Sequence, residues 1–208
     1  MTKIEWASSV DPETGELISG KTWNPVTGCS KVSEGCRNCY AEAISHRYGT
    51  TKKPWTAPNA AENVVTHADR LTLPLKTRKP TTFFVNSMSD LAHALVPLEF
   101  IEAVFHTMAS TPQHTYQILT KRPERMMEAV RYYYEGGYAS KRWVPLANVW
   151  LGVSVEDQRA ADLRIPLLCK IPAAVRFLSC EPLLGGLYIR QHLDHDLDDL
   201  APAVDWVI

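Results

Sequence analysis

Residues 81–110, TTFFVNSMSDLAHALVPLEFIEAVFHTMAS, hold an apolar run that is followed by a helical pattern. The run TTFFV is rich in β-branched and aromatic residues, which are typical of a buried strand. Further along, Ile101, Val104, Phe105 and Met108 repeat at the spacing of one helix face. This stretch therefore predicts one strand followed by one helix.

The same unit recurs along the second half of the chain. The later apolar runs are HTYQILTKRP (114–123), NVWLGVSVED (148–157), AVRFLSCEPL (174–183) and AVDWVI (203–208). The helical patterns between them are ERMMEAVRYYYEGG (124–137) and QRAADLRIPLLCKIP (158–172), and Pro166 must kink or end the second. Strands that alternate with helices predict βαβ units and a parallel sheet. The segment TWNPVT (22–27) is the candidate first strand, which makes six strands.

The first part of the chain gives weaker signals. Residues 1–21 are polar and rich in turn formers, and predict a loop or a small hairpin. A helix is expected over YAEAISHRYG, ending at Gly49. The segment AENVVTHADRLTLPL (61–75) continues a helical pattern, with Asn59 as a candidate cap.

The composition is that of an ordinary globular protein, with 208 residues, 45% hydrophobic residues and a net charge of −1. No apolar run approaches the roughly 18 residues of a membrane span, and the N-terminus has no signal-peptide core. We therefore expect a single domain over residues 1–208, located in the cytoplasm and with no membrane partner. Residues 47–142 carry more Lys and Arg than Asp and Glu, which leaves nucleic acid open as a partner.

Each predicted strand ends in polar residues. Because the carboxyl ends of parallel strands open on one face, which holds the active site in α/β proteins, these side chains are expected to lie together. Ordinary turn and capping chemistry is the alternative at each position. The residues are Asn86, Ser87, Ser89 and Asp90; Thr120, Lys121 and Arg122; Ser154 and Glu156; and Ser179 and Glu181.

Residues 22–42, TWNPVTGCSKVSEGCRNCYAE, bring three of the five cysteines close together. Cys29, Cys36 and Cys39 follow the spacing C-x6-C-x2-C, in which a tight turn can direct two thiolates to one metal centre. An odd number of cysteines in a chain expected in the cytoplasm, where thiols stay reduced, argues against the interpretation as a disulfide framework. A zinc site, an iron–sulfur cluster with one iron left open, and metal-free core cysteines remain as alternatives. Cys169 and Cys180 are expected to be small core residues.

Three close cysteines after a first strand, followed by strand–helix units, resemble the radical S-adenosylmethionine enzymes. That resemblance implies a partial (β/α)6 TIM-like barrel, a [4Fe–4S] cluster on Cys29, Cys36 and Cys39, and S-adenosylmethionine bound at the open iron. It implies that an electron donor supplies the cluster, that electron transfer from the cluster cleaves S-adenosylmethionine to a 5′-deoxyadenosyl radical, and that this radical abstracts hydrogen from an unknown substrate. The usual spacing in that superfamily is C-x3-C-x2-C, so the first gap is longer here.

More narrowly, the chain is similar to a phage- and prophage-associated three-cysteine protein family of unknown function. The similarity rests on TWNPVTGCSKVSEGCRNCYAE, FFVNSMSDL, ILTKRPERM, VWLGVSVE, RFLSCEPLL and DWVI. Members of that family usually continue into a GGESG segment, so the end at Ile208, in mid-strand, is expected to reflect a truncated or split product.

The resemblance also implies roles for the strand-end residues. Tyr40 would pack on the adenine, although packing of a first-turn helix residue on the sheet is an equal alternative. The other cofactor contacts would be Ser87, Ser89, Asp90, Lys121, Arg122, Ser154, Glu156 and Glu181, with Lys121 and Arg122 holding a carboxylate or phosphate.

A rival hypothesis is a non-catalytic accessory protein. In it, a structural zinc or iron–sulfur site stabilises a chain that binds a phage or host protein, or a nucleic acid, through its basic middle part.

Overall fold

The computed structural model describes residues 9–10, 15, 17–18, 20–136, 144–193 and 204–208. Its centre is a six-stranded sheet in the order β10-β9-β8-β7-β6-β3, in which all neighbouring strands are parallel. The strands are β3 (Lys21–Trp23), β6 (Thr82–Val85), β7 (Thr115–Thr120), β8 (Val149–Ser154), β9 (Val175–Ser179) and β10 (Trp206–Val207). The predicted parallel α/β sheet is thereby confirmed.

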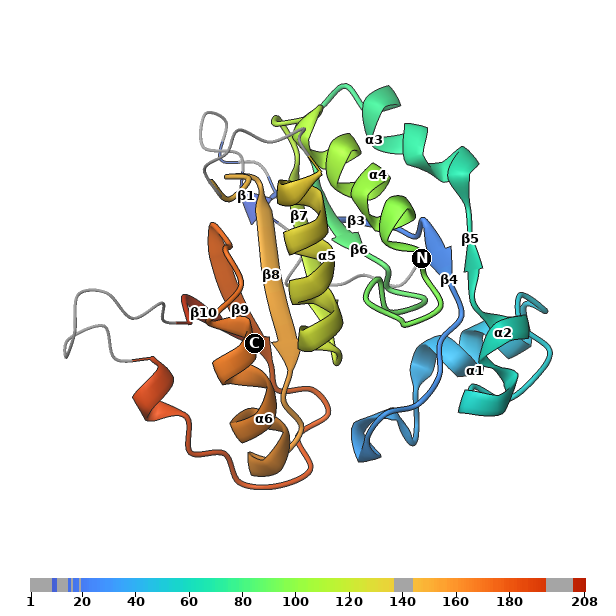
Figure 1. Cartoon of the computed structure of the whole chain (residues 1–208), viewed down its shortest axis with the longest axis vertical. Coiled ribbons are helices and arrows are strands. Elements are labelled where there is room, and N and C mark those ends of the chain that lie inside the picture. The colour runs from blue at the N-terminus through green and yellow to red at the C-terminus, as the bar shows by residue number, and fades with distance from the viewer. Residues whose placement is uncertain (1–8, 11–14, 16, 19, 137–143, 194–203) are drawn as a thin grey trace.

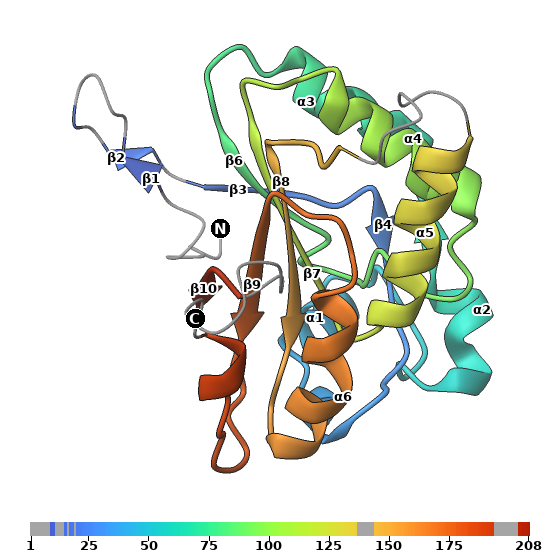
Figure 2. The same cartoon turned by 60° about the vertical axis from the view of Figure 1, so that its left-hand side comes forward.

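Three helices follow consecutive strands and cover one face of this sheet (Figures 1 and 2). They are α4 (Leu98–Ala109), α5 (Pro123–Glu135) and α6 (Gln158–Leu168). Parallel strands joined in sequence order by right-handed crossovers place their helices on the same side. The apolar stripe predicted on α4 is buried against the sheet, with Ile101, Val104 and Met108 fully inside. The core therefore lies between the helices and the sheet.

Local chemistry fixes where two of these helices begin. Pro123 occupies the first turn of α5, where backbone N–H groups have no partner within the helix, so the N–H that proline lacks costs no hydrogen bond. The Asp157 side chain accepts a hydrogen bond from Ala160 N at 2.8 Å and caps α6. Pro166 lies in the last turn of α6, and the helix ends at Leu168, two residues later.

The sheet is open among the described residues, because its outer strands β3 and β10 pair with no further strand of it. The structure is thus a mixed α/β fold around a parallel sheet, and a TIM-like barrel is not confirmed.

The candidate first strand TWNPVT is divided into two short strands. β3 ends at Trp23 within the main sheet, and β4 (Val26–Thr27) pairs antiparallel with β5 (Val65–Thr66). Pro25 lies between them, and a proline has no N–H to donate to a ladder. The chain therefore leaves the sheet before it reaches the cysteines.

The predicted helix over residues 61–75 is wrong in its middle part. Val64 and Val65 are extended, because β5 pairs with β4, and helical turns lie on either side. Asn59 precedes the first of these turns, but its side chain donates to Pro54 O at 3.1 Å and does not cap the helix. Long-range pairing has overridden a local helical preference here.

The remaining elements are short. The predicted helix ending near Gly49 is confirmed as α1, and Gly49 has a φ of 68°. Residues 9–10 and 17–18 form an antiparallel pair. Residues 1–8, 11–14, 16 and 19, on which the prediction of a loop or small hairpin also falls, lie outside the described residues. No helix within the described ranges is long and apolar enough to cross a membrane. These elements are β1 (Ser9–Val10), β2 (Leu17–Ile18), η2 (Glu34–Cys36), α1 (Tyr40–Arg47), η3 (Ala57–Asn59), α2 (Ala60–Asn63), η4 (Ala68–Thr72), α3 (Leu73–Lys76) and η5 (Arg190–His192).

Candidate functional site

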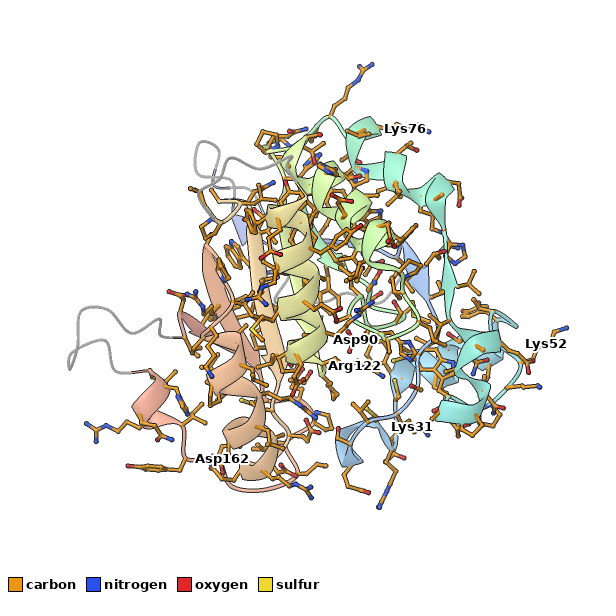
Figure 3. All side chains as sticks on the ribbon, in the orientation of Figure 1. Lys31, Lys52, Lys76, Asp90, Arg122 and Asp162 are labelled. Carbon is orange, nitrogen blue, oxygen red and sulfur yellow. The ribbon has the colours of Figure 1, made fainter. Side chains whose placement is uncertain are left out.

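A pocket opens at the carboxyl ends of β6, β7 and β8. Its empty space is about 680 Å³, part of it open to solvent. One side is formed by residues that follow the strands, here called the strand-end wall (residues 86–90, 120–122 and 154). The facing side is formed by the cysteine segment (residues 29–39) and the start of α1. Figure 3 shows Asp90 and Arg122 side by side in the strand-end wall and Lys31 on the cysteine segment.

Gly28 directs the chain from β4 into the cysteine segment. Its φ is 79°, a left-handed conformation that side chains rarely adopt. Its N–H donates to Met88 O at 3.0 Å, which ties the turn to the end of β6. A Cβ at this position would stand 1.8 Å from Asn63 O, so only glycine fits. Cys29 consequently begins next to the strand-end wall.

The far part of the cysteine segment rests against the end of β8. A Cβ on Gly35 would stand 3.0 Å from Cδ of Glu156, so this glycine packs directly on that side chain. Cys39 then flanks the first residue of α1, and Tyr40 Oη donates to Ser87 O at 2.9 Å. The segment therefore runs across the pocket from the end of β6 to the end of β8.

Asp90 organises the strand-end wall. This buried carboxylate accepts hydrogen bonds from Thr120 Oγ1 at 2.8 Å, Ala92 N at 3.0 Å and Lys121 N at 3.2 Å. It also pairs with Arg122 Nη1 at 2.7 Å. Buried charges persist when they are paired and hydrogen-bonded, and both conditions hold here. The ends of β6 and β7 are thereby joined at one residue.

Arg122 connects the strand-end wall with the cysteine segment. Besides Asp90, its guanidinium contacts Cys29 Sγ at 3.6 Å, Ser30 O at 2.8 Å and Ser30 Oγ at 3.4 Å. Nη1 and Nη2 together carry four N–H groups, and the contacts with Asp90, Cys29 and the two Ser30 oxygens account for all four. Arg122 is therefore an anchor for the first cysteine, and these N–H groups are already engaged by the protein.

The Cys29 thiol is held in its neutral form. Burial raises the pKa of this thiol to about 11, and the Asp90 carboxylate adds to the effect while Arg122 opposes it. A bound metal centre would require the thiolate, which the Arg122 guanidinium is placed to stabilise.

A histidine that the sequence analysis did not single out contacts the cysteine segment. His93 is buried, and its Nε2 lies 2.9 Å from Ser30 Oγ. Its Nδ1 accepts a hydrogen bond from Leu95 N at 3.2 Å, so in the neutral ring Nε2 carries the proton and donates to Ser30. Burial, together with Arg122, lowers the pKa of His93 to about 4, which keeps the ring neutral. A histidine that donates to a serine cannot serve as its general base, so this pair is no activated nucleophile.

Lys121 differs from its neighbour Arg122. Its backbone N–H bonds to Asp90, while its half-buried side chain lines the pocket. It makes no ion pair with any residue that the structure describes. Lys121 therefore offers a positive charge to an anionic group in the pocket.

The structure brings most of the sequence-predicted site residues together, but not all of them. Glu156 is buried behind the cysteine segment and pairs with Arg164 at 2.7 Å. Although burial acts to raise it, hydrogen bonds from Arg164 and Ser33 hold the pKa of Glu156 below its usual value. Glu181 is exposed, and neither glutamate lines the pocket. The sequence-predicted residues that do line it are Cys29, Cys36, Cys39, Tyr40, Asn86, Ser87, Ser89, Asp90, Thr120, Lys121, Arg122 and Ser154.

The hydroxyl groups at the end of β6 already have acceptors. Ser87 Oγ donates to Asn24 Oδ1 at 3.2 Å, and Ser89 Oγ donates to Val26 O at 2.9 Å. These two hydroxyls can still accept hydrogen bonds from a ligand, but their own protons hold the chain around Asn24 and Val26 in place.

The chemistry of the three pocket cysteines fits an iron–sulfur cluster, because thiolates are the ligands of such clusters. All five cysteines are free, and three of them face one pocket. Within the part of the chain that the structure describes, no group of three or more His, Cys, Asp or Glu side chains is gathered closely enough to hold a metal ion. A metal ion held by all three cysteines would therefore require their side chains to lie closer together than they do here. Cys169 and Cys180 pack instead against the core as half-buried residues.

The fold and the pocket define a mixed α/β protein with a cysteine-lined site at the ends of parallel strands. The chain belongs to a family of proteins of unknown function, DUF5131, whose profile matches residues 1–208. No curated protein and no solved structure matches the chain.

Proposed function

We propose that the chain is an iron–sulfur enzyme of the radical S-adenosylmethionine type. In this proposal, Cys29, Cys36 and Cys39 hold a [4Fe–4S] cluster and the adjoining pocket binds S-adenosylmethionine. The observation that carries the proposal is that these three cysteines line the same pocket as the polar residues of the strand-end wall. Three protein ligands leave one iron open for a ligand, whereas electron-transfer clusters usually have four.

The fold is compatible with this proposal. The strands of the sheet follow one another in sequence order, and α4, α5 and α6 lie on one face. A partial (β/α)6 TIM-like barrel would have the same strand order and the same placement of helices. The pocket also lies at the carboxyl ends of the strands, which is the face that such barrels use.

The lining residues suggest how a cofactor would be held. Lys121 would pair with the carboxylate, because it lines the pocket and makes no ion pair with a described residue, although its charge also acts on Glu156. Phe84 and Leu119 supply apolar lining in the same pocket as Tyr40, against which an adenine ring would pack. The contacts of Glu156 and Glu181 with the cofactor remain predictions, because neither glutamate lines the pocket.

When bound, a cluster with an open iron supplies an electron for the reductive cleavage of S-adenosylmethionine. The chain's own contribution is to bind and orient. Arg122 holds Cys29 in place and offsets the charge of its thiolate, and Asp90 keeps Arg122 in position. An electron donor and a substrate of unknown class complete the proposed reaction.

A non-catalytic metal protein is the second candidate. The observation in its favour is that three basic residues at and after the end of α1, Arg47, Lys52 and Lys53, are exposed. Figure 3 shows Lys52 pointing away from the body of the protein. In this case a zinc or iron–sulfur site would stabilise a surface for a nucleic acid or for a phage or host protein.

Anaerobic incubation with S-adenosylmethionine and dithionite tests the enzymatic proposal. The reconstituted protein should release 5′-deoxyadenosine, and each of Cys29→Ala, Cys36→Ala and Cys39→Ala should abolish the release. Cys169→Ala is the matched control and should retain it. A protein that is loaded with iron but forms no 5′-deoxyadenosine would leave only the second candidate.

A further inference from the structure

Ser30 lies at the end of a hydrogen-bond chain that starts on the backbone after β6. Leu95 N–H donates to His93 Nδ1 at 3.2 Å, and His93 Nε2 lies 2.9 Å from Ser30 Oγ. Arg122 Nη2 approaches the same hydroxyl oxygen at 3.4 Å. Ser30 itself lines the pocket, directly after Cys29. This series of hydrogen bonds therefore leads from a fixed backbone group to the edge of the site.

The direction of these bonds determines what the Ser30 hydroxyl can do. A hydroxyl has one hydrogen to donate and two lone pairs that accept. Neutral His93 presents N–H toward Ser30 because its other nitrogen already accepts, and a guanidinium never accepts. Neither neighbour can receive the Ser30 hydrogen, and no other residue of the described ranges accepts from Ser30 Oγ. The hydroxyl hydrogen is therefore available to a pocket ligand.

We infer that Ser30 donates a hydrogen bond to the sulfur of a metal centre bound at Cys29, and that His93 and Arg122 orient this hydroxyl. The inference rests on the proposed function and names a positioning residue for it. Hydrogen bonds to cluster sulfurs are among the protein's means of setting reduction potentials. Such a bond stabilises the more negative, reduced state, so Ser30 raises the potential.

The reduction potential of the reconstituted protein tests this role. Ser30→Ala should bind as much iron as the unaltered chain, because Ser30 is no ligand, and its midpoint potential should shift to a more negative value. Ser30→Thr keeps a hydroxyl and should restore the midpoint. His93→Ala should shift the midpoint in the same direction, but should cause no further shift in a Ser30→Ala background.

The possible failures are distinguishable. Full iron content in Ser30→Ala with an unchanged midpoint would overturn this inference and leave the proposed function standing. Absence of bound iron in the unaltered protein would overturn the proposed function and this inference with it.

A second measurement needs no metal. Nitrogen-15 NMR of the metal-free protein should show His93 protonated on Nε2 and unprotonated on Nδ1. A ring protonated on Nδ1 would remove the donor to Ser30 and overturn the inference, whatever the protein binds.

Discussion

The strand-end wall and the cysteine segment face each other across one pocket, but they are built differently. In the strand-end wall, Asp90, Thr120 and Ser154 are buried, and Asp90 alone joins four hydrogen-bonding partners. In the cysteine segment, Cys36 and Cys39 are half-buried and lie among exposed residues. The strand-end wall is therefore the more buried and more extensively hydrogen-bonded region, while the second and third cysteines lie nearer the surface.

Cys29 is the point at which the two regions are joined. It belongs to the cysteine segment, yet Gly28 and Arg122 tie it to the strand-end wall. The comparison suggests that one cysteine is placed in advance and that the other two complete the site. Each substitution predicted below alters one part of the site at a time.

The largest change in stability is expected from Asp90→Ala. This substitution leaves Arg122 buried without its partner and removes the acceptor for Thr120 and Lys121 N. Breaking a buried ion pair costs about 3–5 kcal/mol. Urea unfolding should show a loss of this size, whereas the exposed Asp69→Asn should change the free energy of unfolding by less than about 0.5 kcal/mol. Equal losses in the two variants would contradict the role given to Asp90.

A smaller loss is expected from Gly28→Ala, with Gly49→Ala as its matched control. Both glycines have a positive φ, of 79° and 68°, so an alanine is strained at either position by about 1–2 kcal/mol. Only at Gly28 does the new Cβ also meet backbone, at Asn63 O. Overpacking adds about 1–3 kcal/mol there. Thermal or urea unfolding should therefore show that Gly28→Ala lowers the free energy of unfolding clearly more than Gly49→Ala does. The reverse order would be incompatible with the turn described.

A change in ligand binding is expected from a substitution in the strand-end wall. Lys121→Gln removes a positive charge from the pocket lining and should weaken S-adenosylmethionine binding about tenfold, which corresponds to about 1.4 kcal/mol. The exposed Lys52→Gln carries out the same chemical change away from the pocket and should leave the dissociation constant unchanged. Isothermal titration calorimetry measures both. Unchanged binding in Lys121→Gln would rule out this contact.

The last expected effect is a dependence of stability on pH. The pKa of His93 is lowered to about 4 in the folded protein, whereas an unfolded histidine has an ordinary value near 6.5. Between these values the unfolded state binds the extra proton, so the contribution of His93 to stability falls as the pH falls from about 6.5 to about 4. His93→Gln should flatten the pH profile of urea unfolding in this window. An identical profile would show that His93 titrates normally.

The repeating part of the fold could be predicted from sequence because its signals are local. Hydrophobic periodicity defined the strands and helices from residue 81 onward, and the polar residues after each strand pointed to the face that carries the pocket. The division of the first strand could not be read in this way, because β4 and β5 pair across about forty residues of chain.

The contacts that define the site were also beyond local patterns. Ser30 and His93 are 63 positions apart, and Cys29 and Arg122 are 93 positions apart. Glu156 was expected in the site because it follows a strand, but its side chain turns to Arg164 on α6. Sequence position placed these residues at the correct end of the sheet, and only tertiary packing determined which of them face the pocket.

The iron and sulfide content of the anaerobically reconstituted protein tests the central claim most directly. We expect about four irons and about four sulfides per chain in a brown protein. The Cys29→Ala, Cys36→Ala and Cys39→Ala variants should lose them, and Cys169→Ala should retain them. One tightly bound zinc in a colourless protein, or a protein that binds no metal, would contradict the account.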